Sequence, residues 1–328
     1  MEDNSLQDLN RKRKAGFYKD EHAESYLRHV NEILQNDESK DYLDLEEEHA
    51  TLFVFGLPRS GTTFMGQLTA HSFDTGYINN FMARFWLAPV TGIKLSSIIL
   101  GNKHSAGFES EYATTLRLED LHEYGYFWRY WLKKDTIPDI LSSRENEAFI
   151  DWAGLKKTVL NMHYAFGKSW ACKNIFGAYH IKKLSGVFRK SMFIYIERDP
   201  LDVAVSIMDA RKKFYHDPKT WWSTVPYEYP TLKDLSAEEQ VAGQVHYLRK
   251  FYDQELSGID PSRVIRVRYE QAAAHPQETA SLIRNMTMEA TGTELTPLPG
   301  LPESFAVRTY EHRKEEKKRF ADIMKQFK

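Results

Sequence analysis

The chain has 328 residues, of which 42% are apolar and 27% are charged, and its formal net charge is −2. This composition excludes a disordered or fibrous protein, and the near-neutral charge argues against nucleic-acid binding through bulk positive charge. The only cysteine, Cys172, excludes an internal disulfide and a cysteine-rich zinc site, and it fits a reducing, cytoplasmic location.

The first 50 residues are charged and carry apolar residues at helical spacing, which predicts a helical lead-in without chemistry. The segment Met1–Lys14 is too polar for a signal peptide. The most apolar stretch, Phe85–Leu100, is too short to span a membrane and contains Pro89 and Lys94. A buried helix is the favoured interpretation of this stretch, and a membrane-surface or substrate-lid segment is the alternative.

Three runs of β-branched and aromatic residues predict buried strands over residues 51–55, 191–196 and 264–269. Helical patterns between and after them span residues 149–162, 176–188, 200–213, 236–257 and 276–289. This alternation predicts an α/β fold, a parallel sheet with helices on both faces. We expect one domain over residues 1–328, with a lead-in over 1–50, a core over 51–290 and a C-terminal extension over 291–328. The extension ends in a charged helix that is predicted to face solvent.

A glycine-rich loop, GLPRSGTT over residues 56–63, directly follows the first strand and precedes a helical pattern. Its spacing matches the phosphate loop G-x-x-x-x-G-K-[ST], with Thr62 in place of the lysine. The glycines let backbone N–H groups point inward, the helix N-terminus favours anions, and Arg59 adds a cation. The loop therefore predicts a cradle for a diphosphate-like group. ATP hydrolysis is disfavoured, because the lysine that reaches the β- and γ-phosphates is missing.

A second motif, ERDPLDVAVS over residues 197–206, follows the strand at 191–196. Asp199 and Pro200 are explained by a helix start. That explanation does not cover Arg198 at the strand end or Ser206 two helical turns later. Since the carboxyl ends of parallel strands border the ligand crevice, Arg198 is predicted to bind a second anionic group of the same ligand.

Together, LPRSGTT over residues 57–63 and RDPLDVAVS over residues 198–206 resemble the two donor-binding motifs of the sulfotransferases. The resemblance covers residues 50–290 approximately, is closest to bacterial-type members, and includes WACKN at 170–174, which is similar to the family's lysine segment. It implies a P-loop NTPase-like three-layer fold and the donor 3′-phosphoadenosine 5′-phosphosulfate (PAPS), with adenosine 3′,5′-bisphosphate (PAP) as product and no metal. By resemblance, the residues that hold the 5′-phosphosulfate are Arg59, Ser60, Gly61, Thr62 and Thr63, and those that hold the 3′-phosphate are Arg198 and Ser206.

Two departures from the family pattern are visible. The family's cytosolic members carry Lys-Thr-His, with the histidine as base, whereas this chain keeps Lys173 but has Ile175 in the histidine's place. The glycine-rich basic motif that helps to bind the 3′-phosphate near the C-terminus is also absent. Arg308, or Arg313 with Lys314, could replace it, although a charged surface helix is the favoured interpretation.

Sulfuryl transfer requires a base for the acceptor's proton and cations near the leaving phosphate. Arg59 and Lys173 are the candidates for the cations. Glu123 is the favoured base and His122 the second, because the aromatic residues around them could desolvate a carboxylate and raise its pKa. The other candidates for the base are His104, Glu109, Glu111 and Glu119.

These observations predict a cytoplasmic, metal-independent sulfotransferase that acts on a hydroxyl or amine of a glycan, lipid or small metabolite. No nucleic-acid partner and no transmembrane segment are expected. Trp221 and Trp222 lie in a proline-containing segment and either stack on the acceptor or only anchor the loop. The alternatives are a phosphate-loop kinase or nucleotide hydrolase, and a non-catalytic protein that binds a nucleotide or an anionic glycan.

Overall fold

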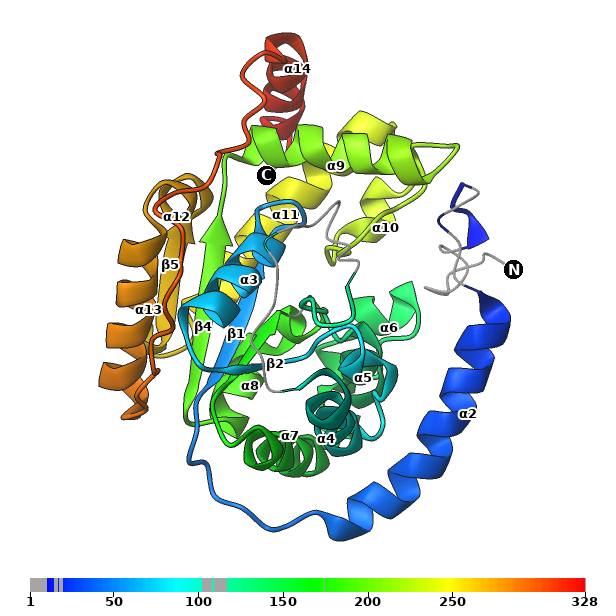
Figure 1. Ribbon diagram of the computed structural model, residues 1–328. Coiled ribbons are helices and arrows are strands. Elements are labelled where there is room, and N and C mark those ends of the chain that lie inside the picture. The colour runs from blue at the N-terminus through cyan, green and yellow to red at the C-terminus, as the bar shows by residue number, and fades with distance from the viewer. Residues whose placement is uncertain are drawn as a thin grey trace.

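A five-stranded parallel sheet lies at the centre of the molecule, in the order β2–β3–β1–β4–β5 (Figure 1). The computed structural model describes residues 11–14, 17, 20–101, 108, 117–173 and 175–327. The strands are β1 (Thr51–Gly56), β2 (Gly76–Tyr77), β3 (Trp170–Lys173), β4 (Ser191–Glu197) and β5 (Val264–Arg268). The predicted parallel α/β sheet is confirmed.

The helices cover both faces of this sheet. In chain order they are α2 (Glu21–Glu38), α3 (Thr62–Ser72), α4 (Pro89–Leu100), α5 (Gly125–Leu132), α6 (Ile137–Leu141), α7 (Trp152–Phe166), α8 (Ile181–Val187), α9 (Pro200–Phe214), α10 (Tyr229–Leu232), α11 (Ala237–Leu256), α12 (Tyr269–Ala274), α13 (Pro276–Thr291) and α14 (Lys314–Met324). All five predicted helical patterns correspond to helices, although the second becomes α-helical only at Ile181, after a 3-10 turn over Gly177–His180, and the first also begins later than expected. It starts at Trp152 because the Asp151 carboxylate accepts a hydrogen bond from the Gly154 N–H at 2.8 Å and caps the helix.

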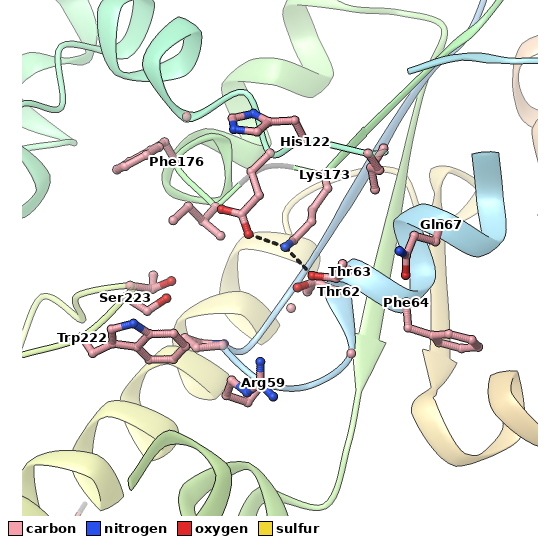
Figure 2. Close-up of a pocket in the computed structure, with 18 of the residues that line it drawn as sticks. Arg59, Thr62, Thr63, Phe64, Gln67, His122, Lys173, Phe176, Trp222 and Ser223 are labelled. Carbon is pink, nitrogen blue, oxygen red and sulfur yellow. Dashed lines mark hydrogen bonds and ion pairs between the residues drawn. The ribbon is translucent and has the colours of Figure 1, made fainter. Parts of the chain in front are cut away.

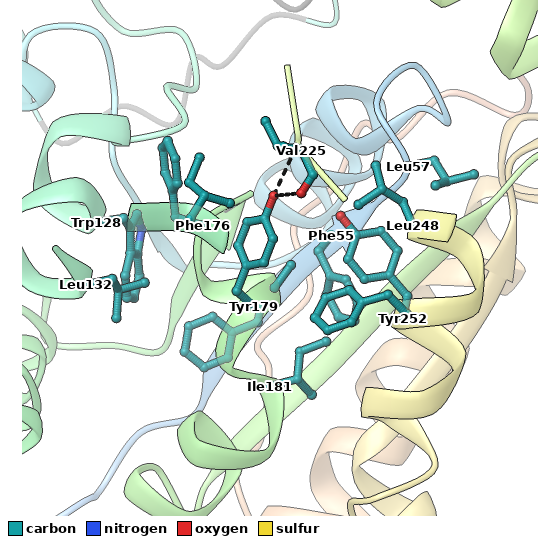
Figure 3. Packing of buried hydrophobic residues seen from close by; sticks show 14 of the residues in the cluster. Phe55, Leu57, Trp128, Leu132, Phe176, Tyr179, Ile181, Val225, Leu248 and Tyr252 are labelled. Atoms are coloured by element: carbon teal, nitrogen blue, oxygen red, sulfur yellow. Dashed lines mark hydrogen bonds between the residues drawn. The ribbon is translucent and has the colours of Figure 1, made fainter. Parts of the chain in front are cut away.

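Alternation along β1 divides the core into two layers. Phe53 and Phe55 face the side covered by α7, α8, α9 and α11, whereas Leu52 and Val54 face the side covered by α3, α12 and α13. Because both faces are covered, every residue of β1 is buried. Figure 3 shows the first layer, where the Tyr179 hydroxyl donates to the Val225 carbonyl at 2.7 Å and accepts from the Val225 N–H at 3.0 Å.

Two strands were not predicted. β2 has two residues and β3 has four, which is too short for a periodic pattern to appear. β3 nevertheless matters for the site, because it lies between β2 and β1 and its last residue, Lys173, ends at the same edge of the sheet as the glycine-rich loop.

The apolar stretch at 85–100 is only partly buried. It forms α4 from Pro89 onward, and Gly92 and Ile93 are buried. Ile98 and Ile99 at its end are 78% and 59% exposed. The buried-helix prediction is therefore right for the first turns and wrong for the last one. Among the described residues, no helix is long and apolar enough to cross a membrane.

The C-terminal helix α14 was predicted to face solvent, but it packs partly against the rest of the protein. Its Phe320 is buried, and the segment is tied to α9 by ion pairs from Arg313 to Asp209 and from Lys317 to Asp202, each at 2.6 Å. The pKa of Arg313 is raised, mainly by its hydrogen bond to Asp209. The preceding segment lies next to the site described below, where the Phe305 N–H donates to the Ala273 carbonyl at 2.7 Å and the Arg308 N–H to the Tyr269 hydroxyl at 3.3 Å.

Candidate active site

The glycine-rich loop joins β1 to α3 and curls tightly around its own backbone. A Cβ atom at position 56 would lie 2.6 Å from the Ile196 carbonyl oxygen, so only glycine fits there. Gly61 has φ of 104°, in the left-handed region, and a Cβ there would lie 2.6 Å from the Tyr269 ring. Arg59 also adopts a positive φ, of 68°, which is uncommon for a residue with a side chain. Two residues of the loop, Arg59 and Gly61, thus adopt left-handed backbone conformations where the chain turns into α3.

This loop borders a cavity of about 970 Å³ at the carboxyl edge of the sheet. The predicted cradle residues that line it are Arg59, Gly61, Thr62 and Thr63. Ser60 does not line it: its side chain is buried under the loop, near Gly56. The first N–H groups of α3 have no partner within the helix and favour an anion.

Lys173 connects the cradle to the candidate base. Its ammonium donates to the Thr63 hydroxyl at 2.7 Å and forms an ion pair with the Glu123 carboxylate. Figure 2 shows Lys173 reaching toward Thr63 across the cavity. The structure therefore brings together a cation from β3, a hydroxyl from α3 and a carboxylate that precedes α5.

The pKa of Glu123 is lowered, whereas the sequence predicted that it would be raised. Burial raises the pKa of this carboxyl, but the charge of Lys173 and its hydrogen bond outweigh burial, so the pKa lies below its ordinary value of 4.5. The side chain keeps 35% of its surface exposed toward the cavity. Glu123 is therefore ionised at neutral pH and able to accept a proton.

The other candidate bases are placed less favourably. His122 lines the cavity, but its Nδ1 accepts a hydrogen bond from the Tyr124 N–H at 2.9 Å. Glu119 forms an ion pair with Arg117 at 2.8 Å and does not line the cavity. His104, Glu109 and Glu111 lie outside the described residues.

Arg198 stands at the end of β4, beside the loop. Its guanidinium donates to the Arg59 carbonyl at 3.0 Å and to the Arg308 carbonyl, and it lies 4.8 Å from the centre of the Tyr269 ring. Ser206 is buried on α9, and its hydroxyl accepts from Arg59 Nε at 3.1 Å rather than lining the cavity. The two predicted donor-binding motifs thus meet, and Arg59 is their point of contact.

The opposite part of the cavity is lined by aromatic and apolar side chains. They are Trp86, Tyr126, Ile140, Phe176, Tyr179, Trp221 and Trp222. Trp221 is buried and donates from its indole N–H to the Thr224 carbonyl at 3.3 Å, whereas Trp222 and Ser223 are half-buried and face the cavity (Figure 2). Trp221 thus anchors the loop, one of the two roles left open by the sequence, whereas stacking of Trp222 on an acceptor stays a prediction.

Comparison with known proteins identifies the family. A sequence model of the sulfotransferase family matches residues 51–287. The chain belongs to the sulfotransferase family. Two curated relatives, the omega-hydroxy-beta-dihydromenaquinone-9 sulfotransferases Stf3 of Mycobacterium bovis and Mycobacterium tuberculosis, are each 25% identical over 249 residues. Those matches cover 69% of this chain and 59% of each relative.

Crystal structures of sulfotransferases share the fold. STF1 of Mycobacterium tuberculosis aligns with a TM-score of 0.53 and 14% identity, over 92% of this chain and 86% of that one. STF9 of Mycobacterium avium aligns with a TM-score of 0.50 and 14% identity, over 93% of this chain and 72% of that one. The predicted P-loop-like fold of the sulfotransferase family is thus confirmed.

Parts of the cavity come from segments outside the family match. Phe305, Ala306 and Arg308 line its cradle end, and Arg13, Glu24 and Leu27 line its aromatic end. The sequence suggested that the lead-in has no role in the site, but three of its residues line the cavity. Since these residues are single positions on charged segments, no local pattern marks them. Among the described residues, no group of His, Cys, Asp or Glu could hold a metal ion.

Proposed function

We propose that this member of the sulfotransferase family moves a sulfuryl group from PAPS to a hydroxyl of a lipid-like small molecule and releases PAP. The observation that carries the proposal is the convergence of Lys173, Thr63 and Glu123 at one end of the glycine-rich cradle. A cation, an anion cradle and an ionised carboxylate in contact are the groups that sulfuryl transfer to an alcohol requires.

The donor is proposed to place its 5′-phosphosulfate against Arg59 and the N-terminus of α3, with Gly61, Thr62 and Thr63 supplying N–H groups and hydroxyls. Ser60 would contribute through its backbone, because its side chain lies under the loop. Arg198 would hold the 3′-phosphate. Ser206, predicted to share this role, does not line the cavity and would act through the hydrogen bond that its hydroxyl accepts from Arg59.

The missing C-terminal motif is proposed to be replaced by Arg308. Arg308 lines the cavity, and its carbonyl already bonds Arg198. Arg313, the other candidate, is engaged by Asp209 and Glu316. Lys314 begins α14, beyond the segment that lines the cavity.

The transfer itself would be an in-line displacement at sulfur. The acceptor oxygen forms a bond to sulfur as the bond from sulfur to the bridging phosphate oxygen breaks. Glu123 takes the acceptor's proton, and Lys173 and Arg59 stabilise the negative charge that builds up on the leaving phosphate. Because Lys173 contacts both Glu123 and Thr63, it is placed to couple proton removal to departure of the phosphate.

The acceptor class is proposed from the cavity wall and from the relatives. The aromatic residues around Phe176 and Trp222 suit an apolar chain that presents a terminal hydroxyl to Glu123. The Stf3 relatives are named for a hydroxylated menaquinone, which supports this class.

We further propose that residues 1–328 act as one domain, since the lead-in, the core and the C-terminal extension all contribute to one cavity.

The test is transfer of label from [³⁵S]PAPS to cell extract, with the organic-soluble and aqueous fractions counted separately and with chelator present. The expected result is label in the organic-soluble fraction together with stoichiometric PAP. In a parallel assay with magnesium and no chelator, ATP turnover without label transfer would support a kinase or hydrolase instead and overturn the proposal.

A further inference from the structure

A fully buried arginine, Arg211, lies between α9 and α11. Its guanidinium donates to the side-chain carbonyls of Gln240 at 2.7 Å and Gln244 at 3.1 Å, and it lies 4.8 Å from the centre of the Trp221 ring. Among the described residues it forms no ion pair with a carboxylate, and burial lowers its pKa to about 9. A buried cation without a counter-ion is costly, and apolar residues of the same size would stabilise a fold at least as well.

The guanidinium fixes the orientation of the two glutamine amides. Because arginine can only donate hydrogen bonds, each amide must turn its oxygen toward Arg211 and its NH₂ group away from it. The NH₂ group of Gln244 then donates to the carbonyls of Trp222 at 3.0 Å and Thr224 at 2.7 Å. The loop that lines the aromatic end of the cavity is thus held by an amide whose orientation Arg211 sets.

Gln240 makes the equivalent contacts elsewhere. Its NH₂ group donates to the carbonyls of Lys233 at 2.8 Å and Leu235 at 3.4 Å, in the segment before α11. Neither of these residues lines the cavity. The two glutamines therefore share Arg211 but hold different segments.

The loop held by Gln244 has a conformation that needs support. Ser223 has φ of 68°, in the left-handed region that a serine rarely adopts, and it lies between the two carbonyls that Gln244 binds. Trp222 and Ser223 point into the cavity that Thr63 and Lys173 also border (Figure 2). On the other side, α9 carries Ser206, the partner of Arg59, five residues before Arg211.

We propose that Arg211 and Gln244 are positioning residues for the acceptor: they hold Trp222 and Ser223 against the acceptor chain and thereby set which acceptors the enzyme takes. This inference rests on the proposed function for the identity of the site's occupant. Its structural part, that Gln244 and not Gln240 orders the cavity loop, stands on the hydrogen bonds alone.

The test compares Gln244→Glu with Gln240→Glu. Each substitution gives Arg211 a carboxylate partner and removes one pair of N–H donors, but only Gln244→Glu releases the loop at 221–224. Hydrogen exchange of the peptide over residues 215–228 is expected to accelerate in Gln244→Glu alone. With [³⁵S]PAPS and farnesol as an apolar alcohol probe, its KM for farnesol is expected to rise about tenfold, the effect of two lost hydrogen bonds, while the KM for PAPS stays unchanged.

Equal exchange in the two variants would overturn the inference, as would an unchanged farnesol KM in a Gln244→Glu variant whose loop exchanges faster. If Gln244→Glu does not fold, Gln244→Met removes the same two donors without adding charge and is judged by the same measurements. PAP binding by the unsubstituted protein separates the two claims. Its absence would refute the proposed function, whereas the exchange comparison would still decide the role of Gln244.

Discussion

The two ends of the cavity are assembled in different ways. At the proposed donor end, four of the lining residues lie within Arg59–Thr63, and we propose that backbone N–H groups and one helix N-terminus do much of the binding. At the acceptor end, the lining residues come from distant segments that include Leu27 on α2, Tyr126 on α5 and the loop carrying Trp222. A local motif thus builds the proposed donor end, while the wall of the proposed acceptor end depends on tertiary packing. Substitutions at the donor end should lower turnover with any acceptor, and those at the acceptor end should change which acceptor is used.

The largest effect is expected from Glu123→Gln. The substitution keeps the shape of the side chain but removes the base, so turnover should fall about 10²- to 10⁴-fold while PAP binding persists. Glu119→Gln is the matched control, because Glu119 lies nearby but does not line the cavity and should leave turnover unchanged. Near-normal turnover of Glu123→Gln, measured by [³⁵S]sulfuryl transfer, would remove this residue from the mechanism.

The second largest effect is expected from Lys173→Met. Turnover should fall about 10²- to 10³-fold, because the negative charge on the leaving phosphate loses a stabilising cation. The pH profile gives a second readout. In the unsubstituted protein the lowered pKa of Glu123 keeps the base ionised above pH 4.5, so the acid limb of kcat/KM should lie below that value. Without Lys173, burial outweighs the smaller lowering effect of His122 and raises the pKa of Glu123, so the acid limb should move to higher pH. An unchanged acid limb would show that Lys173 does not control the base.

Arg198→Ala should act on recognition more than on chemistry. Loss of a charged hydrogen-bond partner of the 3′-phosphate should weaken PAP binding about 10- to 100-fold and leave 5′-AMP binding nearly unchanged. Arg284→Ala offers the comparison, since Arg284 pairs with Glu294 at the surface and does not line the cavity. The assignment would be wrong if Arg198→Ala bound PAP and 5′-AMP with the same ratio as the unsubstituted protein.

The same difference, between a local motif and tertiary packing, explains which site residues could be predicted from the sequence. Arg59, Thr63 and Arg198 could be placed because glycine spacing and strand ends are local signals, and Lys173 because its segment resembles that of the family. The side-chain position of Ser60 could not be predicted, because it depends on the close approach of β4 to the loop. Leu27 and Arg13 could not be found either, since an apolar or basic residue on a charged segment has no local signature.

The smallest effect is expected at Cys172, which neighbours Lys173 on β3 but faces the buried core instead of the cavity. Burial raises the pKa of this thiol, so it should stay protonated and unreactive at neutral pH. Titration with a thiol reagent should show no reaction in the native protein and one reactive thiol after denaturation. Rapid native labelling would mean that the strand beside the donor site opens to solvent.

The cradle and Arg198 are proposed to bind together a nucleotide with both a 5′- and a 3′-phosphate. Titration of the protein with PAP and with 5′-AMP, followed by calorimetry or by the shift in Tm, tests it most directly. PAP is expected to bind at least tenfold more tightly than 5′-AMP, since only PAP offers the 3′-phosphate to Arg198. Equal affinity for the two nucleotides, or tighter binding of ATP than of PAP, would contradict it.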